Sequence, residues 1–132
     1  MPETIELPYV TLFYDAPVVF CRYKADHELG FPEIREMVTA SERLSSGKPY
    51  VTLADVRKGL RITQQGKKLA ASRTNMPLFR GTAVLVTSDL LRLAANMMNE
   101  IVSRNYPYKV FTDEEKAVSW LRSLPLEAEG AS

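Results

Sequence analysis

The sequence is poor in the side chains that most often build reactive centres. Cys21 is the only cysteine and His27 the only histidine among 132 residues. A single cysteine allows no intrachain disulfide, and these two residues cannot supply the four Cys/His ligands of a structural zinc site. There is also no Gly-rich phosphate loop, no paired-carboxylate arrangement and no Ser/His/Asp set. We therefore expect a protein without a catalytic site, a metal or another cofactor.

Long apolar runs and an excess of one charge are absent as well. No apolar run approaches the roughly 18 residues that span a bilayer, and residues 1–4 lack the basic-then-apolar start of a signal peptide. The 17 basic and 16 acidic residues give a formal net charge of +1, which exerts no global attraction on nucleic acid or membranes. We expect a cytoplasmic protein with no transmembrane segment and no nucleic-acid partner.

What the sequence does contain is an alternation of strand and helix patterns. Two runs rich in aromatic and β-branched residues, separated by Asp15-Ala16-Pro17, predict an antiparallel hairpin. Further strands are predicted over 50–54, 82–87 and 108–111, and helices over about 32–44, 63–75, 89–103 and 112–124.

The resulting order is β-β-α-β-α-β-α-β-α. It predicts one α/β domain with a mixed sheet of four to five strands and helices mainly on one face. We assign residues 1–8 to an N-terminal arm, 9–124 to the domain and 125–132 to a flexible tail.

Three stretches carry a resemblance to a known family. They are residues 50–57, the strand 83–86 leading into 90–96, and the ending 110–121. Together they resemble the STAS-like domains related to the anti-sigma factor antagonist SpoIIAA, in particular the uncharacterised bacterial SpoIIAA-like proteins sometimes grouped as STAS/SEC14. The resemblance covers roughly residues 9–124. It implies a noncatalytic regulatory or scaffolding module that recognises another protein.

The phosphorylation switch of that family is altered in this chain. Antagonists of the family act through a phosphorylatable serine in an Asp-Ser-Ser-Gly turn that opens the second helix. Here the turn falls on Thr63-Gln64-Gln65-Gly66, so the glycine is matched but glutamines replace both serines. The resemblance therefore implies that the usual phosphoserine switch is missing. Thr63 is the only nearby hydroxyl and remains a candidate phosphosite, although an N-cap oxygen is normally bonded to a backbone N–H.

Basic residues gather in one part of the chain. Between Asp55 and Asp89 there is no acidic residue, while seven basic residues occur there: Arg57, Lys58, Arg61, Lys67, Lys68, Arg73 and Arg80. The first five, which we call the basic edge, surround the loop and the start of the second predicted helix. Cations near a helix N-terminus favour anions, which predicts an acidic protein partner, a phosphate-bearing ligand or an anionic lipid. The alternative is a solvated face whose charge is balanced elsewhere.

The third predicted helix is apolar around more than one stripe. A helix on one face of a small sheet needs an apolar arc of only about 100°. The surplus predicts a contact surface for a homodimer or a protein partner, unless the helix is unusually buried. The residues that we expect at this contact are Leu90, Leu93, Met97, Met98 and Ile101.

Two other functions remain open. The SEC14 comparison implies an apolar ligand, and the aromatic hairpin with the Met-rich third helix would line a cavity for a small ligand or a lipid. Asp55, Thr87 and Lys109 lie at strand ends, as do the aspartate, Ser/Thr and lysine of a receiver domain, so phosphotransfer through Asp55 or Thr63 is a second alternative. The opening hairpin and the lack of an acidic pair after the first strand argue against a receiver site.

Overall fold

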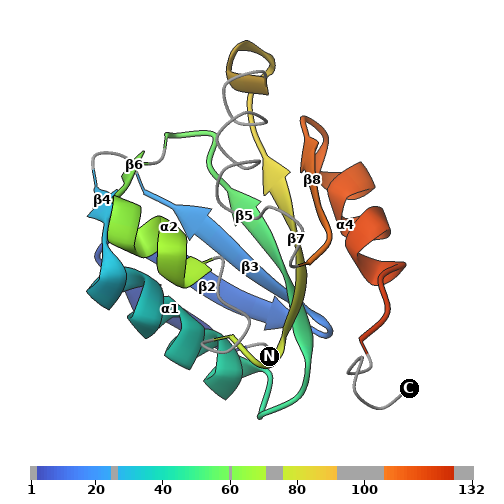
Figure 1. Ribbon diagram of the computed structural model, residues 1–132. Helices are drawn as coiled ribbons and strands as arrows, with labels where there is room; N and C mark the ends of the chain where they lie inside the picture. The colour runs from blue at the N-terminus through green and yellow to red at the C-terminus, as the bar shows by residue number, and fades with distance from the viewer. Residues whose placement is uncertain (1–2, 25–26, 60, 71–75, 92–105, 127–132) are drawn as a thin grey trace.

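A six-stranded mixed sheet forms the centre of the computed structural model (Figure 1), which describes residues 3–24, 27–59, 61–70, 76–91 and 106–126. The strand order is β1-β2-β3-β5-β7-β8. The strands are β1 (Thr4–Leu7), β2 (Val10–Asp15), β3 (Val18–Tyr23), β5 (Tyr50–Asp55), β7 (Phe79–Leu85) and β8 (Tyr108–Phe111). A separate pair of short parallel strands consists of β4 (Glu28–Leu29) and β6 (Arg61–Ile62).

The observed strand pairing contains the predicted antiparallel hairpin and the predicted run of parallel strands. β2 and β3 form the antiparallel hairpin, and β3, β5, β7 and β8 run parallel to one another. The sheet nevertheless has more strands than the four or five expected. Residues Thr4–Leu7, which we assigned to an arm, form β1 and pair antiparallel with β2. Ile5 and Leu7 pack against the core while Thr4 and Glu6 are exposed, which is the period-two alternation of a strand.

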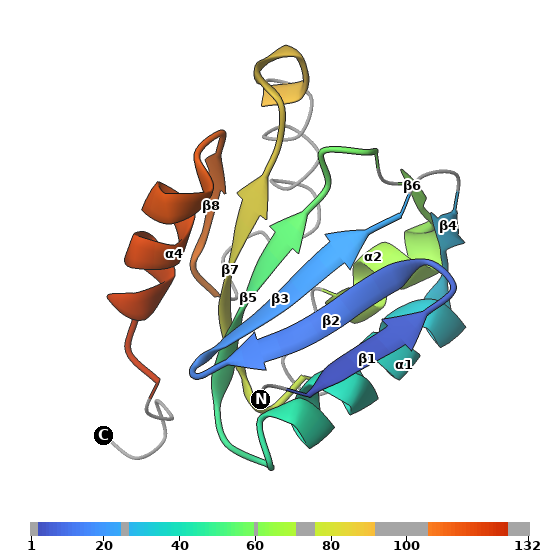
Figure 2. The same cartoon turned by 180° about the vertical axis from the view of Figure 1, so that it is seen from behind.

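The helices lie on both faces of the sheet. α1 (Phe31–Leu44) and α2 (Gln64–Ala70) cover one face, which we call the pocket face, and α4 (Glu114–Arg122) covers the other (Figures 1 and 2). α4 is therefore the exception to the expectation that helices lie mainly on one face. Of the third predicted helix, the described residues include only a 3-10 turn, η1 (Ser88–Leu90), and Leu91. No helix of the described residues is both long and apolar enough to cross a membrane.

Alternation along the strands builds a separate core on each face. On β5, Val51 and Leu53 pack beneath Ala117 and Leu121 of α4, while Tyr50 packs with α1 on the pocket face. The helix predicted over about 32–44 is confirmed as α1, and its face toward the sheet is buried through Ile34, Met37, Val38, Ala40, Ser41 and Leu44. The central strands thus hold two apolar layers together.

Candidate functional site

An apolar pocket lies on the pocket face, between the sheet and the layer that contains α1. Its volume is about 120 Å³. The sheet contributes one wall and α1 the facing wall, and Ile62, Met76 and Tyr106 lie at other parts of the lining. The remaining lining residues are Cys21, Tyr23, Leu29, Ile34, Met37, Val38, Ser41, Tyr50, Thr52, Ala54, Val56, Phe79, Thr82 and Val84.

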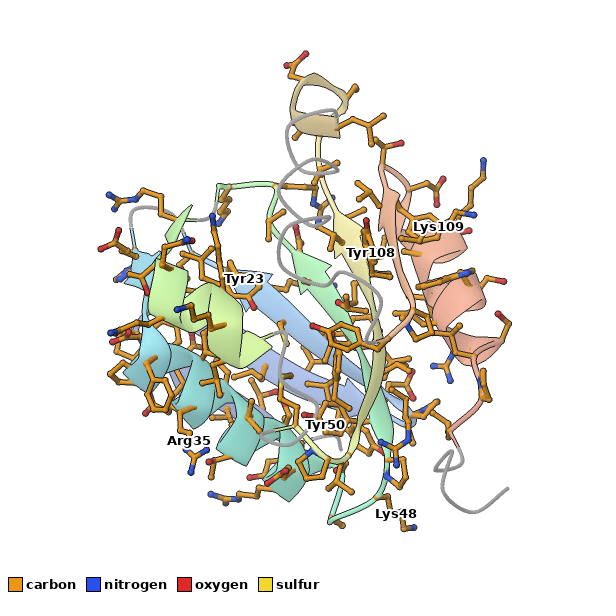
Figure 3. All side chains as sticks on the ribbon, in the orientation of Figure 1. Tyr23, Arg35, Lys48, Tyr50, Tyr108 and Lys109 are labelled. Carbon is orange, nitrogen blue, oxygen red and sulfur yellow. The ribbon has the colours of Figure 1, made fainter. Side chains whose placement is uncertain are left out.

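Small side chains in the middle of the sheet leave the space for this pocket. β5 places Thr52 and Ala54 on the pocket face, between the larger Tyr50 at its start and Val56 just beyond its end. Figure 3 shows Tyr50 and Tyr23 near opposite ends of this face, on β5 and β3. The pocket is therefore a gap over two short side chains, bordered by aromatic rings.

Two polar side chains of the lining are bonded to each other. The Thr52 hydroxyl donates to the Thr82 hydroxyl over 2.9 Å. Burial raises the pKa of Tyr50 and outweighs the opposite effect of Ser41, which lies close to it. Tyr106 makes a further interaction within the protein. The Tyr23 hydroxyl has no hydrogen-bond partner as far as the described residues extend.

Burial keeps the titratable groups of the pocket uncharged at neutral pH. It raises the pKa of the Tyr23 phenol well above its ordinary value, with the neighbouring Cys21 and Tyr9 adding to the effect. Burial also raises the pKa of the Cys21 thiol to about 12. Cys21 is only 3% exposed, as expected of a small buried apolar residue, and it is a poor nucleophile because little thiolate is present.

A cluster of four charged side chains lies on the other face, where β3 and β5 end and α4 begins. Arg22 donates to Asp55 over 2.9 Å and to both carboxylate oxygens of Glu114 over 2.9 and 3.0 Å. Arg57 donates to both oxygens of Asp55 over 2.9 and 2.8 Å. The Arg22 guanidinium also lies over the stacked rings of Phe13 and Phe20. The cluster is balanced in charge and ties α4 to the sheet.

This arrangement makes Asp55 unsuited to phosphoryl transfer. Burial alone would raise its pKa, but hydrogen bonds from Arg57 and Arg22 outweigh that effect and lower it. Both carboxylate oxygens are bound by guanidinium groups, and Asp55 is only 7% exposed. No group of three or more acidic, Cys or His side chains that would hold a metal occurs among the described residues.

The basic edge is only partly a free surface. Arg57 is bound to Asp55, and Lys67 is partly buried and makes an interaction within the protein. Lys58, Arg61 and Lys68 are exposed and form no ion pair with other described residues. The acidic Glu28 lies beside Arg61 in the register of β4 and β6, so the charge of this edge is mixed.

The other two basic residues between Asp55 and Asp89 are Arg73 and Arg80, which do not belong to the basic edge. Arg80 donates to the carbonyls of Pro77 and Leu126, before the start of β7 and after the end of α4. Arg73 lies outside the described residues.

Thr63 has the N-cap role that the sequence predicts. Its hydroxyl oxygen accepts a hydrogen bond from the Gly66 N–H over 3.0 Å, at the start of α2. A phosphate at Thr63 would have to displace this bond. Whether Thr63 is a phosphosite stays a prediction.

The predicted apolar contact surface falls largely on residues that the structure does not describe. Leu93, Met97, Met98 and Ile101 lie outside the described residues, and Leu90 is known only as the last residue of η1. Leu91 beside it is 41% exposed. The homodimer contact therefore stays a prediction.

Two features of the site escaped the sequence analysis. The ion pairs of Arg22 with Asp55 and Glu114 join residues 33 and 92 positions apart, and no local pattern reveals such a link. The pocket had a weak signal, since Thr52 and Ala54 are small residues at alternate positions of a buried strand. The hairpin contributes Cys21 and Tyr23 to it, whereas Met97 and Met98 of the expected lining lie outside the described residues.

Comparison with solved structures supports the fold. The chain is similar to an uncharacterised protein of the DUF3478 family from Shewanella loihica PV-4, whose crystal structure has a SpoIIAA-like fold. The TM-score is 0.50 at 17% sequence identity, and the match covers 92% of each chain. The predicted resemblance to SpoIIAA-like domains is thereby confirmed for the fold.

A family match places the chain more narrowly within this class of α/β proteins. Residues 12–125 match the family described as Domain of unknown function (DUF7793), and the chain belongs to that family. No curated protein matches the sequence.

Proposed function

We propose that this protein is a noncatalytic regulatory module that binds a small apolar molecule in the pocket between the sheet and α1. The observation that supports this best is the pocket of about 120 Å³, with a predominantly apolar lining. Ligand sites in proteins are mostly apolar concavities with a few polar groups, which matches this lining.

The size of the pocket favours a small molecule over a lipid. Apolar cavities of about 150 Å³ bind benzene, whereas drug-sized ligands occupy roughly 300–1,000 Å³. A molecule of about the size of a single aromatic ring therefore suits the volume. A phospholipid or a long acyl chain exceeds it, so of the two apolar ligands implied by the SEC14 comparison we favour the smaller.

Titration of the ¹⁵N-labelled protein with toluene, followed by heteronuclear NMR, tests the pocket. We expect saturable shifts of backbone amides around the lining, for example at Ala54 and Val84, without global changes in the spectrum. Ala54→Leu adds a side chain that fills the space and should abolish these shifts. Ser119→Leu adds the same side chain to an exposed position of α4 and should leave them unchanged. Absence of saturable shifts in the wild-type protein would refute the proposal.

A second candidate function is recognition of an acidic protein partner, as the family resemblance implies. It is favoured by the exposed side chains of Lys58, Arg61 and Lys68, which form no ion pair with other described residues. A partner bound through these charges should be lost from affinity purifications with the double variant Lys58→Glu/Arg61→Glu. It should be retained with Lys48→Glu, an exposed charge reversal in the connection between α1 and β5. Equal recovery with both variants would exclude this surface.

A further inference from the structure

The Tyr23 hydroxyl differs from the bonded threonine pair of the pocket. It belongs to the lining, and in the described part of the chain it has no hydrogen-bond partner. A phenol O–H both donates and accepts hydrogen bonds. Leaving such a group in an apolar site without a partner is unfavourable unless water or a ligand bonds to it. Tyr23 therefore offers one place at which a ligand can be recognised by a polar contact.

The two threonine hydroxyls of the lining compete poorly for a ligand. Thr52 and Thr82 are bonded to each other. A ligand group directed at either of them would have to break this bond, whereas a bond to Tyr23 breaks none within the described protein.

The lining also restricts the charge of the ligand. No Lys, Arg, His, Asp or Glu side chain belongs to the pocket lining as described. A buried ion is strongly disfavoured unless an opposite charge or several hydrogen bonds compensate for its lost hydration. The neutral Tyr23 phenol offers a single hydrogen bond, which does not compensate for a full charge. A carboxylate or ammonium ligand is thus disfavoured.

From these observations, and resting on the function proposed above, we propose that the ligand is an uncharged molecule of about the size of one aromatic ring. It carries one oxygen-containing group that hydrogen-bonds to the Tyr23 hydroxyl. Phenols and small cyclic alcohols or ketones belong to this class. Tyr23 would then select among molecules of equal size and shape, while the apolar walls supply most of the affinity.

Phenol and toluene form a matched pair of probes, because they differ only in a hydroxyl that replaces a methyl group. The dissociation constants of both are measured by NMR titration with the wild-type protein and with Tyr23→Phe. We expect Tyr23→Phe to raise the dissociation constant of phenol about tenfold relative to that of toluene, because the hydroxyl of phenol loses its hydrogen bond to Tyr23. Toluene should bind both proteins with similar affinity. Benzoate, which is charged, should not bind to either.

Tyr108→Phe serves as the control variant, because it removes the hydroxyl of a partly exposed tyrosine outside the pocket lining. It should leave the ratio unchanged. An independent measurement on the wild-type protein is the ¹³Cζ resonance of Tyr23, which phenol should shift and toluene should not. This second measurement does not depend on the folding of any variant.

The two proposals fail in different ways. If neither probe binds to the pocket, the proposed function is refuted and the role of Tyr23 with it. If both bind, but Tyr23→Phe leaves the ratio unchanged or the Tyr23 resonance responds equally to both, the role of Tyr23 alone is refuted. If benzoate binds as tightly as phenol, the ligand class is wrong.

Discussion

At the scale of single residues, Gly66 shows how a missing side chain positions α2. An added Cβ at Gly66 would lie 2.9 Å from the Leu29 carbonyl oxygen and 3.0 Å from Cγ1 of Ile62. Its N–H also donates to the Thr63 hydroxyl. The glycine thus lets the first turn of α2 approach the β4–β6 pair closely. Close packing therefore accounts for a glycine at this position.

Replacing Gly66 with alanine should destabilise the protein. In an exposed helix, Gly→Ala stabilises by about 1 kcal/mol. Here the new methyl group meets backbone, which cannot move away cheaply, so we expect the free energy of unfolding to fall by about 1–3 kcal/mol. Urea denaturation followed by circular dichroism measures the change. Gln65→Ala, at the exposed neighbouring position, should have little effect. An unchanged or higher stability of Gly66→Ala would contradict the close packing.

At the scale of elements, the charged cluster is a polar link between α4 and the sheet, and it is more buried than the Arg122–Asp15 pair, which also joins them. Asp55 lies at the end of β5, Arg22 in β3 and Glu114 at the start of α4. The side chains of Arg22 and Glu114 are 35% and 36% exposed, so their ion pair is partly screened by water. Asp55 is the most buried member, and its removal should therefore have the largest effect.

The lowered pKa of Asp55 makes this link sensitive to acid. Asp55 binds its proton less readily in the folded than in the unfolded protein, so it adds stability above its unfolded pKa of about 3.9. That contribution is lost as the pH falls from this value through the lower pKa of the folded state. Asp55→Asn should lower the free energy of unfolding at pH 7 by about 1–3 kcal/mol and flatten its decline below about pH 4.

Urea denaturation at several pH values measures both effects of Asp55→Asn. Asp15→Asn is the matched control, because Asp15 also pairs with an arginine, Arg122, but its side chain is 70% exposed. We expect less than about 1 kcal/mol from that change. An acid-induced decline as steep in Asp55→Asn as in the wild-type protein would show that other groups cause it.

Sequence patterns revealed those elements whose periodicity extends over several turns or alternations. The hairpin, β5, β8 and α1 were predicted close to their observed bounds, and β7 begins three residues earlier and ends two residues earlier than predicted. β1 was missed because it has only four residues and Pro8 follows it directly. β4 and β6 have two residues each, which is too short for any period. Local pattern thus accounts for the layers of the fold.

The candidate site was much less predictable than the fold. Whether Thr52 and Ala54 are covered by a large side chain or leave a gap depends on how α1 packs over them, and the sequence does not encode that locally. The prediction of a basic edge treated Arg57 as free, but Asp55, two residues before it, binds it. Ion pairs formed within a turn or between strands therefore decide which charged side chains remain available to bind a partner.

At the scale of the whole molecule, the central strands couple two apolar layers. β3 and β5 contribute side chains alternately to the core beneath α1 and to the core beneath α4. If one of these strands separates from the sheet, both apolar cores lose side chains at the same time. The described part of the chain should therefore unfold as one cooperative unit, although its two helical layers do not pack against each other through a shared core.

Leu121→Ala tests this coupling from the α4 side. Leu121 is fully buried, and its truncation should lower the free energy of unfolding by about 2–5 kcal/mol. Native-state hydrogen exchange should show the same loss of protection for slowly exchanging amides of α1 as for those of α4, because both open only in global unfolding. Ser119→Ala, at an exposed position of the same helix, should change neither. Loss of protection confined to α4 would mean that this helix opens alone, and the two layers would then be independent units joined by one sheet.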